Sequence, residues 1–185
     1  YEDILGTYLV KLSALKISEN DSSEAAMLLK ALSDFERIGD HALNILESAE
    51  ELKGKNLSLS DAARHELNVL LRAVEEIVDM TFRAFRDDDL KKAYRVEPLE
   101  QVIDDLKEKM RIHHILRMQQ GSCSIESGFV WSDLLTALER VGDHCSNIAV
   151  AIIELESDSF DTHEYLSSVR ALKSHSFDKY YDCLL

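Results

Sequence analysis

The amino-acid sequence predicts an all-α protein, and three observations indicate this fold class. Apolar residues recur every three or four positions along most of the 185 residues, which is the period of an amphipathic helix. Helix-breaking residues are few, because the chain has one proline, Pro98, and six glycines, too few for the turns of a sheet protein. Residues 32–45 also recur as residues 135–148 with eight identities, which indicates duplication of one helical unit.

The first half of the chain predicts a short helix followed by a long one. Apolar residues within positions 8–15 indicate the short helix. A polar turn at residues 18–21 follows, where Asp21 and Glu24 have the spacing of an N-cap and the carboxylate that returns to it. The long helix then continues to about Leu52.

A third helix is predicted after a loop at residues 54–60. Ser58 and Asp61 have capping-box spacing at the end of this loop. The apolar residues that follow lie on one broad helical face, and the helix should end near residues 87–89.

The second half of the chain predicts two long helices and a short one. The fourth helix covers residues 90–118, and Pro98 either kinks it or begins a new segment at its first turn. Residues 119–128 are polar and contain two glycines, so they form a loop before a fifth helix at residues 129–156. Asp161 has the position of an N-cap for a last, shorter helix.

The repeat divides the chain into two related helical units and a tail. Residues 1–57 are expected to form part of a first helical bundle, and residues 58–158 a second bundle of three helices, followed by a C-terminal helix and tail at residues 159–185. The first unit has only about fifteen residues before its repeat helix and begins at Tyr1. We therefore expect the first bundle to lack its N-terminal part.

Composition excludes several classes of function. The chain has 35 acidic and 21 basic residues, so its formal charge of -14 should repel nucleic acid and anionic membrane surfaces. No apolar stretch approaches the roughly eighteen residues of a membrane-spanning helix, and no signal sequence precedes the first helix. Three widely separated cysteines without CxxC spacing fit a reducing cytoplasm.

The candidate site residues come from the repeated segment. Glu36 and Asp40 are four residues apart, so both carboxylates project from one helical face, and Glu139 and Asp143 repeat the pair. Two like charges at this spacing repel each other unless a cation neutralises them. Carboxylate oxygens suit hard divalent or trivalent metal ions, which makes these pairs candidate metal ligands.

The arginines beside the carboxylates leave an alternative to metal binding open. Arg37 and Arg140 have the spacing for ion pairs with Asp40 and Asp143, so a structural helical adaptor with salt-bridged motifs is a competing interpretation.

The glycines and histidines of the repeat have interpretations of their own. Gly39 and Gly142 each cost about 1 kcal/mol in a helix interior, which indicates close approach of a neighbouring helix. His41 and His144 point away from the aspartates, so hydrogen bonds across the bundle are favoured over metal ligation.

With residues 34–45 (DFERIGDHALNI) and residues 138–144 (LERVGDH), the chain resembles the PhoU family. The resemblance implies tandem three-helix bundles that bind multinuclear iron or zinc clusters through E(D)xxxD motifs. On this sequence the implied metal ligands are Glu36, Asp40, Glu100, Asp104, Glu139 and Asp143. The first-bundle counterpart of the pair on the fourth helix would fall before the start of the chain.

Residues 2–12 (EDILGTYLVKL) are more similar to the PhoU-like C-terminal domain of bacterial sodium/phosphate cotransporters. This similarity implies a transporter membrane domain upstream on the same chain and a cytoplasmic domain of a protein anchored in the inner membrane. The expected function is non-catalytic regulation of phosphate uptake, with phosphate contacting the bound metal.

Two further interpretations stay open beside this one. The first is a free-standing PhoU-type regulator of phosphate signalling. The second is a carboxylate-metal hydrolase or oxidase, for which the sequence identifies no general base. Self-association into a homo-oligomer is also open.

Overall fold

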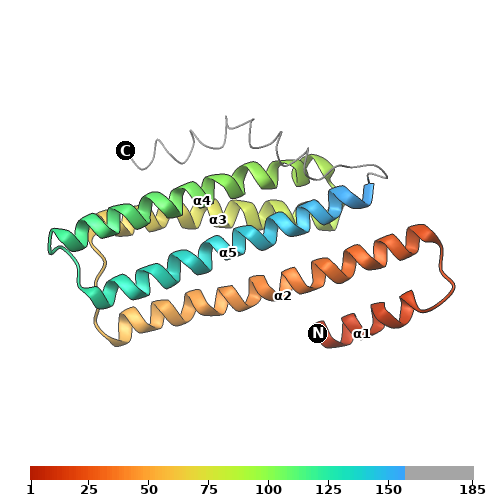
Figure 1. Ribbon diagram of the computed structural model, residues 1–185, viewed down its shortest axis with the longest axis horizontal. Coiled ribbons are helices and arrows are strands. Elements are labelled where there is room, and N and C mark those ends of the chain that lie inside the picture. Colours follow the sequence, from red (N-terminus) through yellow and green to blue (C-terminus); the bar gives the residue numbers. More distant parts are fainter. Residues whose placement is uncertain (157–185) are drawn as a thin grey trace.

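The computed structural model describes residues 1–156, and this part of the chain consists of helices and their connections, as the sequence predicts (Figure 1). The five helices are α1 (Glu2–Ser13), α2 (Glu19–Gly54), α3 (Asp61–Asp87), α4 (Leu90–Gln119) and α5 (Ile125–Glu156). Over the same residues, none of the helices combines the length and apolar character needed to cross a membrane. The helix expected after Asp161 lies outside the described residues.

The N-termini of α2 and α3 are capped by serines at positions other than those predicted. Ser18 Oγ accepts a hydrogen bond from the Asp21 N–H at 3.1 Å, and the Asp21 carboxylate accepts one from the Ser18 N–H at 3.3 Å. Asp21 is therefore the third helical residue of a capping box and not its N-cap. In α3 the N-cap is Ser60 and not Ser58, with the Ala63 N–H donating to Ser60 Oγ at 3.2 Å.

Helices α4 and α5 also settle two open points. Helix α4 continues through Pro98, so of the two alternatives the proline lies inside one helix. Helix α5 begins at Ile125, four residues before the predicted start at Phe129. The earlier start is explained by Ser124, whose Oγ accepts a hydrogen bond from the Ser127 N–H at 3.1 Å and so satisfies a donor of the first turn.

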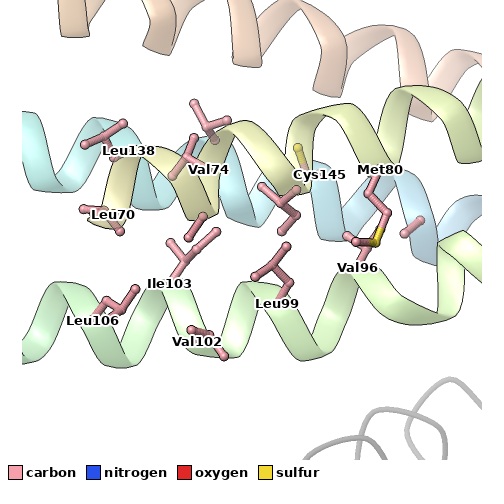
Figure 2. Packing of buried hydrophobic residues seen from close by; sticks show 14 of the residues in the cluster. Leu70, Val74, Met80, Val96, Leu99, Val102, Ile103, Leu106, Leu138 and Cys145 are labelled. Atoms are coloured by element: carbon pink, nitrogen blue, oxygen red, sulfur yellow. The ribbon is translucent and has the colours of Figure 1, made fainter. Parts of the chain in front are cut away.

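The hydrophobic core lies between α3, α4 and α5, each of which packs on the other two. Figure 2 shows the interdigitating side chains, with Leu70 and Val74 from α3 facing Leu99 and Ile103 from α4. Helix α5 adds Leu138, which is 1% exposed, to the same cluster. Close packing of this kind makes the three helices a rigid frame for the side chains on their outer faces.

Helix α2 lies beside α5 and runs antiparallel to it, while α1 folds back along α2 (Figure 1). Much of the apolar surface of this pair stays exposed, including Ile4 at 70%, Leu43 at 55% and Leu46 at 54%. Exposed apolar side chains gathered on one face are typical of a surface that contacts another segment or molecule. The division of the chain into two bundles stays a prediction.

Candidate functional site

The two copies of the repeat meet across the α2–α5 pair. The rings of His41 and His144, which occupy equivalent positions, stack with their centroids 5.5 Å apart and their planes at 23°. Because α2 and α5 are antiparallel (Figure 1), contact between equivalent residues means that the copies are related by an approximate twofold rotation. Two grooves result, and each is lined by residues from both copies of the repeat.

One of these grooves, called here the acidic groove, lies between α2, α4 and α5 and has a volume of about 720 Å³. Its basic side chains are Lys30 and Arg140. Its acidic lining residues are Asp34, Glu97, Glu100, Asp104, Asp143 and Glu154. Six carboxylates around one open groove make a strongly negative surface that favours cations.

Helix α4 supplies three of the carboxylates from one face, because Glu97, Glu100 and Asp104 follow one another at spacings of three and four residues. Glu100 is only 8% exposed. Burial, followed by repulsion from Glu97, raises its pKa to about 7, although Gln101 Nε2 donates a hydrogen bond to Glu100 Oε2 at 2.7 Å. Ionisation of Glu100 in the folded protein therefore costs free energy, and a bound cation would reduce that cost.

Helix α5 brings Asp143 to the same groove. Burial and then repulsion from Glu139 raise the pKa of Asp143, although Arg140 Nη1 donates a hydrogen bond to its Oδ2 at 2.9 Å. The pKa of Asp104 is raised for the same two reasons in the same order. Three predicted ligands, Glu100, Asp104 and Asp143, are therefore brought together by the fold, and their proton affinities are all raised.

Glu139 is held differently from its partner in the motif. Its Oε1 forms an ion pair with Lys107 Nζ at 2.8 Å, and both side chains are largely buried, at 13% and 20% exposure. Arg140 Nε lies 3.8 Å from the other Glu139 oxygen. Glu139 therefore already has a cationic partner, and ligation of a metal ion would require this carboxylate to leave Lys107.

The first-repeat pair does not reach the acidic groove. Glu36 is partly buried, Asp40 is exposed, and neither lines the groove. Arg37 Nη1 lies 3.8 Å from Asp40 Oδ2, so an arginine accompanies the aspartate in both repeats, as the adaptor interpretation expects. Both side chains of the Arg37–Asp40 ion pair are exposed, so this ion pair contributes little to the stability of the fold.

A smaller groove of about 360 Å³ is the counterpart of the acidic groove across the twofold relation. Each of its lining residues is 103 positions from a residue of the acidic groove; these are His41, Asn44, Glu47, Ser48, Glu51, Asp133, Thr136 and Ala137. Its chemistry differs, because Ala137 replaces Asp34 and no described helix takes the place of α4. The duplication therefore leaves two unequal sites.

Asp34 links the two repeat helices at the acidic groove. Its Oδ1 lies 2.8 Å from His144 Nδ1 and accepts a hydrogen bond from Asn147 Nδ2 at 3.2 Å. The predicted hydrogen bond across the bundle is confirmed for His144. His41 instead lies 3.5 Å from Asn44 on its own helix, and burial followed by the charge of His144 lowers its pKa.

The glycines of the repeat do not mark a required close approach. A Cβ on Gly142 would lie 3.6 Å from Ile103, an ordinary van der Waals distance, and one on Gly39 would meet no described atom within 4 Å. The predicted close approach of a neighbouring helix is therefore wrong at Gly39 within the described part of the chain. At Gly142 a helix does lie nearby, but it leaves room for a methyl group.

Sequence reasoning missed three acidic residues of the groove, Asp34, Glu97 and Glu154. Glu97 is 5% exposed and accepts a short hydrogen bond from Ser146 Oγ. Its spacing of three residues from Glu100 places both carboxylates on one face if they share a helix. The sequence left open whether one helix continues through Pro98, which lies between them. For Asp34 there was no local signal, because its partners lie more than a hundred residues away.

Within residues 1–156, no three His, Cys, Asp or Glu side chains are arranged so that they could hold a metal ion as they stand. The carboxylates of the acidic groove are neighbours, but they do not converge on one point. Their chemistry nevertheless suits a hard cation, since all are oxygen donors and the most buried of them, Glu100 and Glu97, repel each other. Cation binding would require side-chain rotations within the groove.

Comparison with known proteins assigns the chain to a family. The family model for the PhoU domain matches residues 1–49 and 67–152. The chain is 32% identical to phosphate-specific transport system accessory protein PhoU homolog 1 of Thermotoga maritima, over 78% of this chain and 61% of that protein. It is 27% identical to the PhoU homolog of Deinococcus radiodurans, over 67% of this chain and 57% of that protein.

The chain thus spans about three fifths of the length of these curated relatives. The crystal structure of PhoU from Pseudomonas aeruginosa has the same fold, with a TM-score of 0.79, 24% identity, and coverage of 84% of this chain and 74% of that one. The family match includes both copies of the repeat and most of α1 to α5. The chain therefore belongs to the PhoU family.

Proposed function

We propose that this chain is a non-catalytic accessory regulator of phosphate transport. The observation that carries the proposal is the family match over both repeat helices, together with relatives that are named as accessory proteins of a phosphate-specific transport system. These names favour a PhoU-type regulator that acts on a separate transporter over a regulatory domain fused to a sodium/phosphate cotransporter. The reading frame upstream of Tyr1 in the gene distinguishes these two arrangements.

The acidic groove is the part of the chain that we assign to ligand binding. Glu100, Asp104 and Asp143 would hold a metal ion there, and Glu139 would join them after release from Lys107. Iron or zinc is the metal that the family resemblance implies. The bound metal would neutralise the repulsion among the carboxylates and offer a positive centre to a phosphate oxygen.

The same groove also contains two contacts between α2 and α5. Lys30 of α2 pairs with Glu154 of α5 at 3.2 Å, and Asp34 of α2 contacts His144 of α5 at 2.8 Å. A ligand that binds the carboxylates of α4 and α5 changes the charge beside both contacts. Ligand occupancy would in this way alter how firmly α2 is held against the bundle, which is the signal a partner protein could read.

Metal content in purified protein tests this assignment. We would measure iron and zinc by elemental mass spectrometry in untagged wild type, Asp143→Asn and Glu100→Gln, with Asp40→Asn as the matched control. Asp143 and Asp40 occupy equivalent positions of the repeat, but only Asp143 lines the acidic groove. We expect the groove variants to lose most of the metal and the control to keep it. Equal metal content in all four proteins would contradict the site.

The regulatory role is tested separately in cells of the source organism. Phosphate uptake would be compared between cells that carry wild type, Asp143→Asn or Asp40→Asn at low and high external phosphate. We expect altered uptake control only with Asp143→Asn. Unchanged uptake in a strain without the gene would exclude the regulatory function, whatever the metal content.

A further inference from the structure

Lys107 of α4 and Glu139 of α5 form an ion pair where the two helices meet. Lys107 Nζ lies 2.8 Å from Glu139 Oε1, and the side chains are 20% and 13% exposed. Removing an ammonium and a carboxylate from water costs free energy that only a close partner offsets. Each of the two charges is therefore held in place by the other.

The second oxygen of the Glu139 carboxylate has no hydrogen bond. Glu139 Oε2 is buried and lacks a hydrogen-bond partner among the described residues. Arg140 Nε lies 3.8 Å from it, beyond hydrogen-bond distance, and the Arg140 side chain is 55% exposed. Because buried carboxylate oxygens are normally hydrogen-bonded or bound to a cation, Glu139 keeps the capacity to bind a cation through Oε2.

Glu139 acts on the carboxylates of the acidic groove without lining the groove itself. After burial, its negative charge is the largest cause that raises the pKa values of Asp104 and Asp143. Lys107 follows Asp104 by three residues on the same face of α4, and its charge opposes the rise in the pKa of Asp104. The Lys107 ammonium thus partly neutralises carboxylates from both helices, as a metal ion between them would.

Lys107 has space to leave this position. Its side chain also lines a second groove of about 450 Å³, called here the α4–α5 groove, which shares none of the described lining residues of the acidic groove. Ser132 and Thr136 line the α4–α5 groove as well, and their hydroxyl groups can accept hydrogen bonds from an ammonium. The four-carbon stem of a lysine is flexible, so the ammonium can turn towards this groove while the backbone of α4 stays in place.

We propose that Lys107 is an internal counter-cation that competes with metal ions for Glu139. A metal ion that enters the acidic groove repels the Lys107 ammonium, which turns into the α4–α5 groove and frees Glu139 as a further ligand. This inference rests on the metal-binding function proposed above. It adds that Lys107 weakens metal binding and that occupancy of the acidic groove changes the charge on a second face of the α4–α5 pair.

Acetylation of lysine side chains tests the displacement in the wild-type chain. Sulfo-N-hydroxysuccinimide acetate reacts with accessible, unprotonated amines, so a lysine in a buried ion pair reacts slowly. The probe is Mn²⁺, which prefers oxygen ligands. We expect the acetylation rate of Lys107, measured by mass spectrometry, to rise at least ~5-fold when Mn²⁺ replaces EDTA. Lys92, which pairs with Asp89 on the same helix outside the acidic groove, is the control and should react at an unchanged rate.

An acetylation control separates the acidic groove from adventitious binding of Mn²⁺ to other carboxylates. The rise at Lys107 should be absent in Asp143→Asn, because this variant lacks a ligand of the groove. A rise that persists in Asp143→Asn would show that Mn²⁺ acts from elsewhere, and the proposal would fail.

The affinity for Mn²⁺, measured from the electron paramagnetic resonance signal of the free ion, tests the competition. Lys107→Met should bind Mn²⁺ at least ~10-fold tighter than wild type, because an additional carboxylate becomes available. Lys92→Met removes the same charge at a distance and should bind as wild type does. Lys107→Arg keeps the ion pair and should also match wild type.

A double variant shows whether the gain depends on Glu139. Lys107→Met/Glu139→Gln should return to the affinity of wild type, because neither protein has a free carboxylate at this position. A gain that persists in the double variant would show that loss of the positive charge is sufficient, which overturns the proposal. Circular dichroism checks the helix content of each variant. If Lys107→Met does not fold, the acetylation experiment decides, since it needs only the wild-type chain and Asp143→Asn.

The remaining outcomes distinguish this inference from the proposed function. If wild type binds Mn²⁺ without any change in the reactivity of Lys107, the inference is wrong and the metal site stands. Equal affinities of Lys107→Met and Lys92→Met would have the same meaning, because an ion pair with a purely structural role does not affect metal binding. If neither wild type nor Lys107→Met binds Mn²⁺, the metal site itself is contradicted, and the inference fails with it.

Discussion

The burial of Glu100 in the acidic groove allows us to predict how much Glu100→Gln changes the stability of the fold. This side chain is 8% exposed, and its pKa is raised from an ordinary 4.5 to about 7 by burial and by repulsion from Glu97, Asp104 and Asp143. At about 1.36 kcal/mol for each pKa unit, keeping Glu100 ionised in the folded protein costs roughly 3 kcal/mol. Glu100→Gln removes the charge and keeps the shape, so the metal-free variant should be more stable than wild type above pH 7.

The sign follows from proton binding. Because the pKa of Glu100 is higher in the folded than in the unfolded protein, the folded state binds more protons between pH 4.5 and 7. The free energy of unfolding of wild type therefore falls as the pH rises through this range. The raised pKa values of Asp104 and Asp143 act in the same direction, and their two largest causes, burial and repulsion from Glu139, are retained in the variant.

Urea unfolding monitored by circular dichroism, in the presence of EDTA, measures the effect. At pH 8 we expect Glu100→Gln to be more stable than wild type by up to roughly 3 kcal/mol, and near pH 4 the two proteins should be equally stable. Glu75→Gln on α3 is the control, because it makes the same substitution at an exposed side chain that does not line the acidic groove. A variant that is no more stable at pH 8, or a difference that does not shrink towards pH 4, would refute the reasoning.

Two further predictions concern packing and a buried charge, and both use urea unfolding at pH 7. Gly128→Ala should destabilise the fold by about 1–2 kcal/mol, because the added Cβ would lie 2.8 Å from the buried His114 ring, whereas Gly39→Ala has open space and should stabilise it by about 1 kcal/mol. Equal effects of the two alanines would show that His114 gives way. Glu66→Gln should cost about 3 kcal/mol, because Arg117 Nη1 donates to the buried Glu66 carboxylate at 3.0 Å and would lose its counter-charge. Asp61→Asn, at a fully exposed ion pair, should have almost no effect, and a similar loss in both variants would contradict the role of burial.

Local patterns in the sequence were sufficient for the helices but not for all of their ends. The helical period predicted all five helices of the described part, since apolar residues recur at that period along each of them. The predicted N-cap residues of α2 and α3 are wrong because several Ser and Asp residues near the start of each helix have the spacing of a capping box. Only the path of the backbone shows that Ser18 and Ser60 are the N-caps. The predicted start of α5 lies too far along the chain because a glycine after a polar stretch indicates a loop, whereas Gly128 lies in the helix against His114.

The sequence by itself determined the fold class, the duplication and, through the repeat, Asp143 of the acidic groove, while Glu100 and Asp104 came from the family resemblance. Helical spacing and an internal repeat are local properties of the chain, so they can be recognised without coordinates. Only the tertiary structure decided that the two copies of the repeat form unequal sites. The acidic groove depends on α4 packing beside α5 and on Asp34 reaching His144 across 110 residues, and no local pattern encodes such a contact.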